Sequence, residues 1–165
     1  MVPNKKMEAL LNKQMNAEFY NSHLYQAMAG WFEGQNLPGF ASWMEIQAGE
    51  ERGHAMKFYN HLKERRGAIL VGAVPAAPVK YKGALDAIQA AFDHEVHVSQ
   101  EINKMMETAL AEKDFAAVEM LRWFVTEQVE EEANVDAILQ QLKMVGESKG
   151  SLMYIDRHVG KRKAA

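Results

Sequence analysis

The chain has 165 residues, of which 48% are hydrophobic, so it has the size of one ordinary domain and enough apolar content for a substantial core. Its 19 basic and 22 acidic residues give a net charge of -3, which provides no electrostatic reason to expect nucleic acid or an anionic membrane as a partner. Cysteine is absent, which excludes disulfides, thiolate zinc sites and iron–sulfur clusters, so any metal must be held by oxygen and imidazole ligands.

Residues that interrupt helices gather in three stretches, residues 34–39, 67–83 and 146–150, which contain most of the glycines and prolines. The segments between them are rich in Ala, Glu, Lys, Met, Gln and Leu, which are good helix formers. The sequence therefore predicts helices over about residues 5–34, 38–66, 83–111 and 114–145, and a short helix over 149–159. We expect them to form a single domain over residues 1–165.

The segment 67–83 is predicted to be a long connection, because its 17 residues include three glycines and two prolines and show no helical periodicity. Fully extended at about 3.3 Å per residue it spans roughly 56 Å, more than the ~45 Å of a 30-residue helix. The other connections between long helices are short. The predicted fold is therefore all-α, an antiparallel four-helix bundle of two hairpins joined by one long crossover, with a short fifth helix at the C-terminal end.

No apolar run approaches the roughly 20 residues needed to cross a bilayer, and the first ten residues lack the apolar core of a signal peptide. We therefore expect a cytoplasmic protein.

Each long segment carries a stripe of residues at steps of three and four, apolar at both ends and polar in the middle. In the segment 83–111 this stripe consists of Ile88, Phe92, Glu95, Ser99, Ile102 and Met106. Such stripes are typical of the inward faces of a bundle.

The polar residues of the stripes follow a repeat. Glu18 and Glu51 are 33 positions apart, as are Glu95 and Gln128, and each second member is followed three positions later by another polar residue, His54 or Glu131. The two hairpins thus carry the same pattern, and all of these residues fall near the middle of their helices. We expect them to converge at the mid-height of the bundle.

Four carboxylates in an apolar core are too costly without cations, and no lysine or arginine lies on the same stripes. Four carboxylates and one imidazole match two divalent metals, and this ligand set indicates iron or manganese rather than structural zinc. Because the second pair is Gln128 and Glu131, without a histidine, the site should be asymmetric.

These positions, with Tyr25 and the acidic runs at 50–51 and 127–132, resemble the ferroxidase-centre motifs of bacterial non-haem ferritins over nearly the whole chain. The resemblance implies a first iron held by Glu18, Glu51 and His54, and a second held by Glu51, Glu95 and Glu131 with Gln128 beside it. Tyr25 would hydrogen-bond near the centre and supply an electron. A third iron position would use Glu50, Glu127 and Glu130 and share Glu131.

The resemblance further implies a ferroxidase that oxidises Fe(II) with O2 or H2O2 and stores the ferric mineral inside a homo-oligomeric shell, a 24-mer. It implies no haem, because Arg52 follows the bridging glutamate where a haem-binding relative would offer methionine.

Two alternatives stay open on the sequence, a di-iron oxidase and a metal-free bundle, and a third, a miniferritin, fits it less well. A di-iron peroxidase or oxidase without storage, similar to rubrerythrin, would usually carry cysteines that this chain lacks. A DNA-protecting miniferritin would place its metal site between subunits, and a metal-free structural bundle would leave these carboxylates exposed or protonated. The remaining histidines, at positions 23, 61, 94, 97 and 158, lie off the site positions, and the basic tail at 161–163 is expected to be a disordered terminus.

Overall fold

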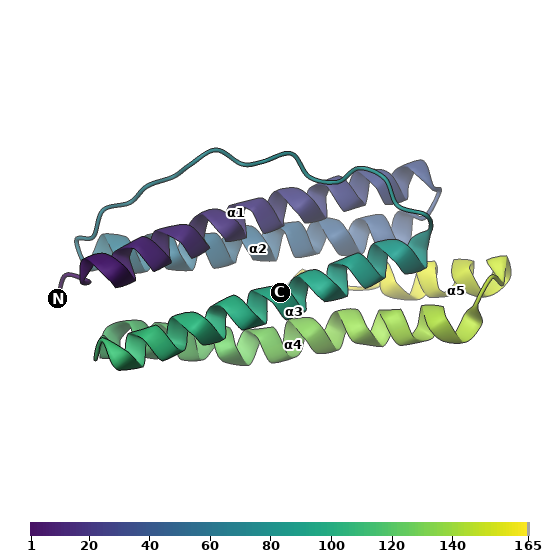
Figure 1. The fold of residues 1–165 in the computed structure, drawn as a ribbon. Coiled ribbons are helices and arrows are strands. Elements are labelled where there is room, and N and C mark those ends of the chain that lie inside the picture. Colours follow the sequence, from purple (N-terminus) through teal and green to yellow (C-terminus); the bar gives the residue numbers. More distant parts are fainter. Residues whose placement is uncertain (165) are drawn as a thin grey trace.

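The computed structural model describes residues 1–164, and within them it contains five helices and no strand. The helices are α1 (Lys5–Gly34), α2 (Pro38–Glu64), α3 (Ala84–Ala111), α4 (Phe115–Val145) and α5 (Lys149–Val159). Figure 1 shows α1 antiparallel to α2 and α3 antiparallel to α4, with α5 at one end of the bundle. The predicted all-α bundle with one crossover is confirmed. The predicted single domain extends to residue 165, which lies outside the described residues.

Helix boundaries differ from the prediction by one or two residues, and local geometry explains the difference. The second helix ends at Glu64 rather than 66, because Arg66 adopts a left-handed conformation (φ 55°) and the Gly67 amide turns back to the Leu62 carbonyl at 2.9 Å. The fourth helix begins at Phe115, because Asp114 is its N-cap and accepts a hydrogen bond from the Ala117 amide (3.1 Å).

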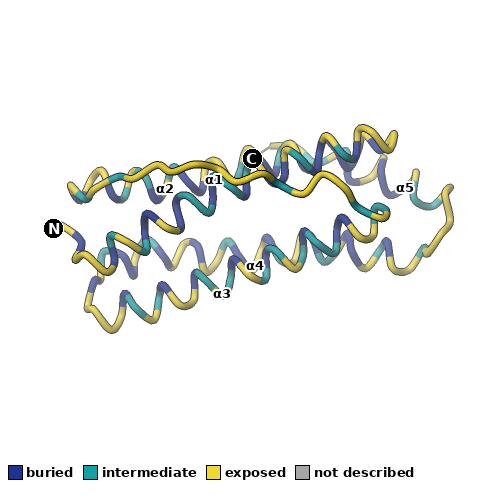
Figure 2. The backbone as a smooth tube through the Cα atoms, turned by 45° about the horizontal axis from the view of Figure 1, so that its top comes forward, coloured by how far each residue is buried: buried dark blue, intermediate teal, exposed yellow. Residues whose placement is uncertain are grey.

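The crossover runs along the whole bundle over α1, and it is exposed for most of its length (Figures 1 and 2). Two asparagines of α1 hold its first part. Asn12 accepts from the Leu70 amide (2.7 Å) and donates to the Ala68 carbonyl (2.9 Å), and Asn16 makes the equivalent contacts to Gly72 and Leu70. The side-chain amides thus satisfy backbone groups that an extended segment would otherwise leave to water.

The bundle core consists of two apolar clusters, which include Phe32, Phe40 and Ile88 in one and Leu11, Phe58 and Phe124 in the other. Figure 2 shows the buried stripes of the helices turned toward the bundle interior. The stripe predicted for the third helix needs one correction. Its buried face is centred on Ala91, Val98 and Met105, whereas Phe92, Ser99 and Met106 are only half-buried at its edge.

The short helix α5 packs against the ends of α2 and α4. Its Asp156 accepts a hydrogen bond from the Phe40 amide at the start of α2 (2.9 Å). A Cβ added at Gly39 would lie 1.8 Å from the Asp156 carbonyl oxygen, so the two backbones touch at this glycine. Among the described residues, no helix is long and apolar enough to cross a membrane.

Candidate metal centre

All four long helices contribute acidic or amide side chains to one buried belt in the middle of the bundle. Each of the six residues of the predicted repeat is no more than 4% exposed: Glu18, Glu51, His54, Glu95, Gln128 and Glu131. Helix α1 provides the first, α2 the next two, α3 one and α4 the last two. The regular stepping of each stripe therefore delivers these side chains to the interior, as the repeat predicts.

Glu18, Glu51 and His54 form the first group that could hold a metal ion. One ligand atom from each residue lies within 4.8 Å of the others, and all three residues are buried. His54 Nδ1 is 3.4 Å from Glu51 Oε2. This is the set of residues expected for the first iron.

A second group consists of His54, Glu127 and Glu131, whose ligand atoms also lie within 4.8 Å of one another. His54 Nε2 is 3.6 Å from Glu127 Oε1. Glu95 belongs to neither group. Its carboxylate accepts hydrogen bonds from the Tyr25 hydroxyl and from Gln128 Nε2 (3.1 Å). The structure thus brings Glu131 toward His54 and Glu127 and holds Glu95 beside Tyr25.

Buried amides orient the carboxylates. Gln14 Nε2 and Asn21 Nδ2 each donate to Glu18 at 2.8 Å, and the amide of Gln47 donates to Glu51 (3.1 Å) and Glu131 (2.7 Å). The repeat of site residues predicts no role for these amides. Their signal is a polar residue three or four positions from a site glutamate on the same buried stripe.

His94 also lies close to the centre. Its Nε2 is 2.8 Å from Asn21 Oδ1, so this ring nitrogen donates to the asparagine that donates to Glu18. Burial is the largest cause that lowers the pKa of His94, and a neutral ring suits this role. His94 is therefore linked to the centre by hydrogen bonds through one side chain, that of Asn21.

The centre holds protons in the absence of metal. Burial, followed by the charges of Glu51 and Glu131, raises the pKa of Glu95 to about 8, and burial with the Glu51 charge raises the pKa of Glu131 to about 7. Burial and Glu51 also raise the pKa of Glu18 well above its usual value. The opposing effect of burial on His54 is outweighed by its hydrogen bond to Glu51, so its pKa rises to about 9. The belt therefore has more acidic groups than it can keep ionised without a cation.

The residues expected at a third iron position are more exposed than the six residues of the repeat, and each of them has different neighbours. Glu127 contacts His54, Glu130 is exposed, and Glu50 is hydrogen-bonded to Arg162 in the C-terminal tail. The expectation of a disordered basic tail is therefore wrong for Arg162, which a charged and a polar partner on α2 fix in place.

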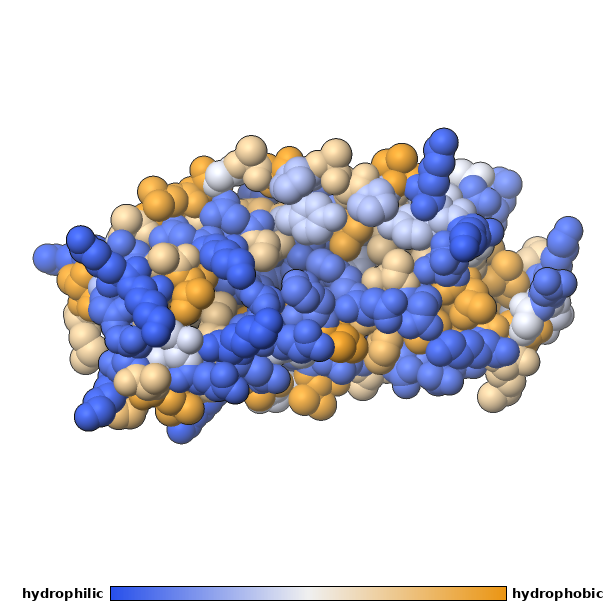
Figure 3. All heavy atoms as spheres, viewed as in Figure 1, coloured by the Kyte–Doolittle hydropathy of each residue, from blue (hydrophilic) through white to orange (hydrophobic). Residues whose placement is uncertain are grey.

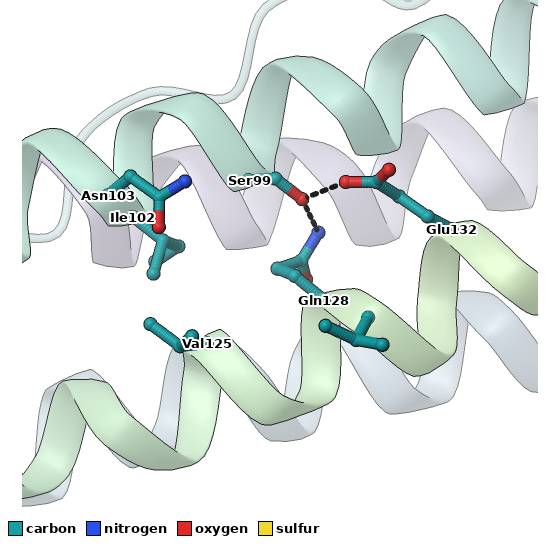
Figure 4. Close-up of a pocket in the computed structure, with 7 residues that line it drawn as sticks. Ser99, Ile102, Asn103, Val125, Gln128 and Glu132 are labelled. Carbon is teal, nitrogen blue, oxygen red and sulfur yellow. Dashed lines mark hydrogen bonds between the residues drawn. The ribbon is translucent and has the colours of Figure 1, made fainter.

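A cavity of about 250 Å³ lies between α3 and α4 beside Gln128. Figure 4 shows the Gln128 amide and the Glu132 carboxylate both directed at the Ser99 hydroxyl on its wall. Because Gln128 also donates to Glu95, this cavity ends one side chain away from the carboxylate belt.

The chain is similar to known proteins along nearly its whole length. Residues 8–145 match the family model described as Ferritin-like domain. A probable bacterial non-heme ferritin-like protein of Haemophilus influenzae is 36% identical over 151 residues, 92% of each chain. The bacterial non-heme ferritin of Bacteroides fragilis is 35% identical over 158 residues, 96% of this chain and 98% of the relative. The open-pore ferritin of Archaeoglobus fulgidus superposes with a TM-score of 0.96 at 40% identity, over 97% of this chain and 99% of that chain.

Proposed function

We propose that this chain, which belongs to the ferritin family, oxidises ferrous iron in the middle of its bundle and stores the ferric product in a homo-oligomeric shell. Membership of the family confirms the resemblance that the sequence motifs indicate. Iron is the substrate and the cargo here, and O2 or H2O2 is the proposed oxidant.

The observation that carries the proposal is the convergence of Glu18, Glu51, Glu95 and Glu131 in one buried belt with His54. Their hydrogen-bond donors are mainly amides and a tyrosine, which orient a carboxylate without neutralising it. Two divalent cations would neutralise the four carboxylates. Hard oxygen ligands also bind ferric iron more strongly than ferrous iron, which favours oxidation.

Each residue has a proposed role in binding ferrous iron. Glu18, Glu51 and His54 hold the first ion, and Glu51 bridges to a second ion at Glu95 and Glu131, with Gln128 beside it. Two ions held side by side can together deliver two electrons to one oxidant molecule. We also propose a third, more weakly held ferrous ion at Glu50, Glu127 and Glu130, with Glu131 shared.

Tyr25 is proposed to supply an electron during oxidation. Its hydroxyl donates to Glu95, and burial, followed by the charge of Glu95, raises the pKa of this tyrosine well above its usual value. The phenol therefore stays protonated next to the second iron position, and its proton can pass to Glu95 when the ring is oxidised.

Storage requires an enclosed space, and the chain is proposed to provide it by assembling with copies of itself into a 24-mer. Large apolar side chains on the crossover support self-association, because Leu70, Val71 and Val79 are each more than 60% exposed. In Figure 3 hydrophobic side chains occur along the upper edge, where the crossover runs, while hydrophilic side chains dominate the middle of that face.

The test is aerobic addition of about two ferrous ions per subunit, with absorbance of the ferric product recorded over time. We expect rapid oxidation in the wild type and a rate lower by roughly 100-fold or more in Glu51→Ala with His54→Ala, because both iron positions lose ligands. The matched control is Glu45→Ala with His97→Ala, which removes the same residue types from exposed positions on α2 and α3.

Equal rates in the wild type and the site variant would remove the support for a ferroxidase centre and favour a metal-free structural bundle. Storage is tested separately by adding several hundred ferrous ions per assembly and measuring the iron that stays with the protein after gel filtration. Rapid oxidation without retention would instead favour a ferritin-like oxidase that does not store iron.

A further inference from the structure

The C-terminal tail returns to α2 after α5 and places one guanidinium at the edge of the carboxylate belt. Arg162 Nη1 donates to Oε1 of the buried Gln47 (2.8 Å), and Nη2 donates to the Glu50 carboxylate. The guanidinium carbon lies 4.4 Å from the ring centroid of Trp43. Only 18% of the Arg162 side chain and 26% of the Glu50 side chain are exposed, so this contact is not a solvated surface ion pair. Three partners on one helix hold this side chain.

The same contact orients the amide of Gln47. Because Arg162 donates to the Gln47 oxygen, the Gln47 nitrogen faces the other way and donates to both Glu51 and Glu131. Gln47 is fully buried, so the guanidinium is linked to two proposed iron ligands through one immobile group. Arg162 is therefore a positioning residue for the centre.

Arg162 also lies where its positive charge would repel a further cation. Glu50 and Glu130 line one cavity of about 560 Å³, and Arg162 forms part of its wall. A metal ion bound to Glu50 would need a carboxylate that the guanidinium now engages, and it would lie next to that positive charge. Arginine stays protonated at all relevant pH values, so the repulsion and the competition for Glu50 end only when the side chain moves away.

We propose that Arg162 is a tethered cation that competes with a third ferrous ion for Glu50, so that this position fills only when the tail is displaced. The inference rests on the proposed function, because it concerns the third iron position of the same centre. It makes the tail a device that limits the resting centre to two ions and admits a third at high ferrous concentration.

The test is calorimetric titration of the intact, metal-free assembly with Fe(II) in the absence of oxygen. The wild type should bind two ions per subunit tightly and a third weakly. In Arg162→Gln, the third ion should bind about tenfold more tightly or better, because a charge-assisted hydrogen bond and a repulsive charge are both removed. Arg162→Leu, which keeps an apolar side chain on Trp43, should give the same gain even if the glutamine variant alters the tail.

Two controls separate competition from a general change in charge. Lys161→Gln removes one positive charge from an exposed residue of the same tail and the same cavity wall, and it should leave the third affinity within about twofold of the wild type. Glu50→Gln combined with Arg162→Gln should abolish the gain, because the carboxylate freed by the arginine variant is then missing.

Unchanged third-site affinity in both arginine variants would overturn the inference, and so would an equal gain in Lys161→Gln or a gain that persists without Glu50. Each of these results would leave the two tight sites, and hence the proposed function, intact. A wild type that binds no ferrous ion tightly would instead overturn the proposed function itself.

Discussion

Three side chains of the centre hold protons near neutral pH that a metal ion must displace. Burial and neighbouring charges raise the pKa of Glu95 to about 8 and that of Glu131 to about 7, while the pKa of His54 rises to about 9 because its hydrogen bond to Glu51 and nearby negative charges outweigh the lowering effect of burial. At pH 7 we therefore expect anaerobic loading of the two tight sites to release about two protons per subunit or more. Titration calorimetry in buffers of different ionisation enthalpy measures this number.

The number of protons released on metal binding also identifies which side chains lose them. Glu95→Gln should release about one proton fewer at pH 7, and the wild type should release fewer at pH 9 than at pH 7, because Glu95 and Glu131 are then already ionised. A heat of binding that does not depend on the buffer would show that the belt is ionised before metal arrives, contrary to this prediction.

Some of these residues could be placed from sequence and others could not. Glu18, Glu51, His54 and Glu95 occur at regular steps along amphipathic stripes, so helical geometry alone carries them to the belt. Titration with ferrous iron tests whether these side chains bind it. The contact between Arg162 and Gln47 joins residues 115 positions apart and depends on where the residues after α5 fold, which no periodicity encodes.

The docking of α5 depends on the absence of a side chain at Gly39. A Cβ there would lie 1.8 Å from a backbone oxygen of Asp156, which cannot move without shifting the whole short helix. Gly39→Ala should therefore lower the free energy of unfolding by about 1–3 kcal/mol, as overpacking typically does, and loosen α5. Denaturant titration measures the first effect, and hydrogen exchange of the α5 amides measures the second.

Gly30 provides the matched control for this substitution. It lies inside α1, and nothing lies within 4 Å of a Cβ added there. Gly30→Ala should be neutral or stabilise the protein by up to about 1 kcal/mol, because alanine is the better helix former. If both alanine variants behaved alike, the contact at Gly39 would not restrain α5.

Helix positions followed from the sequence because each long helix has an apolar stripe and its breakers cluster at its ends. The error at positions 91 and 92 in the inward face of α3 has a physical cause. Small residues such as Ala91 can face the core where two helices approach closely, while the larger Phe92 packs at the edge, and a stripe chosen by apolar size favours the larger residue. The hydrogen bonds that hold the crossover against α1 come from asparagines, and apolar periodicity does not reveal such polar contacts.

For the whole molecule, the carboxylate belt divides the core into two apolar clusters, so the metal-free fold must bury acids between them. The clusters supply the favourable burial, and the protons on the belt limit the electrostatic penalty. Any condition that removes those protons without supplying a cation should weaken the fold.

The metal-free protein should consequently lose stability as the pH rises from about 6 to 9. Glu95 and Glu131 have folded pKa values of about 8 and 7, above their usual 4.5, so the folded state binds more protons than the unfolded state in this window. His54 acts in the same direction, because its contribution is complete below about 6.5 and is lost as the pH rises through about 9. The lowered pKa of Glu51 has the opposite sign, but its effect lies at more acidic pH.

We expect a decrease on the order of a few kcal/mol per subunit across this range, measured by denaturant unfolding of metal-free protein at fixed concentration. Glu95→Gln should flatten the decrease, because a glutamine has no proton to lose. Saturation with a redox-inert divalent ion such as Zn(II) should reverse the slope, since ligand binding favours the deprotonated groups and strengthens as pH rises. A metal-free stability that stayed level or rose over this range would mean that the carboxylates are ionised in the folded protein, and that cations other than protons already balance the belt.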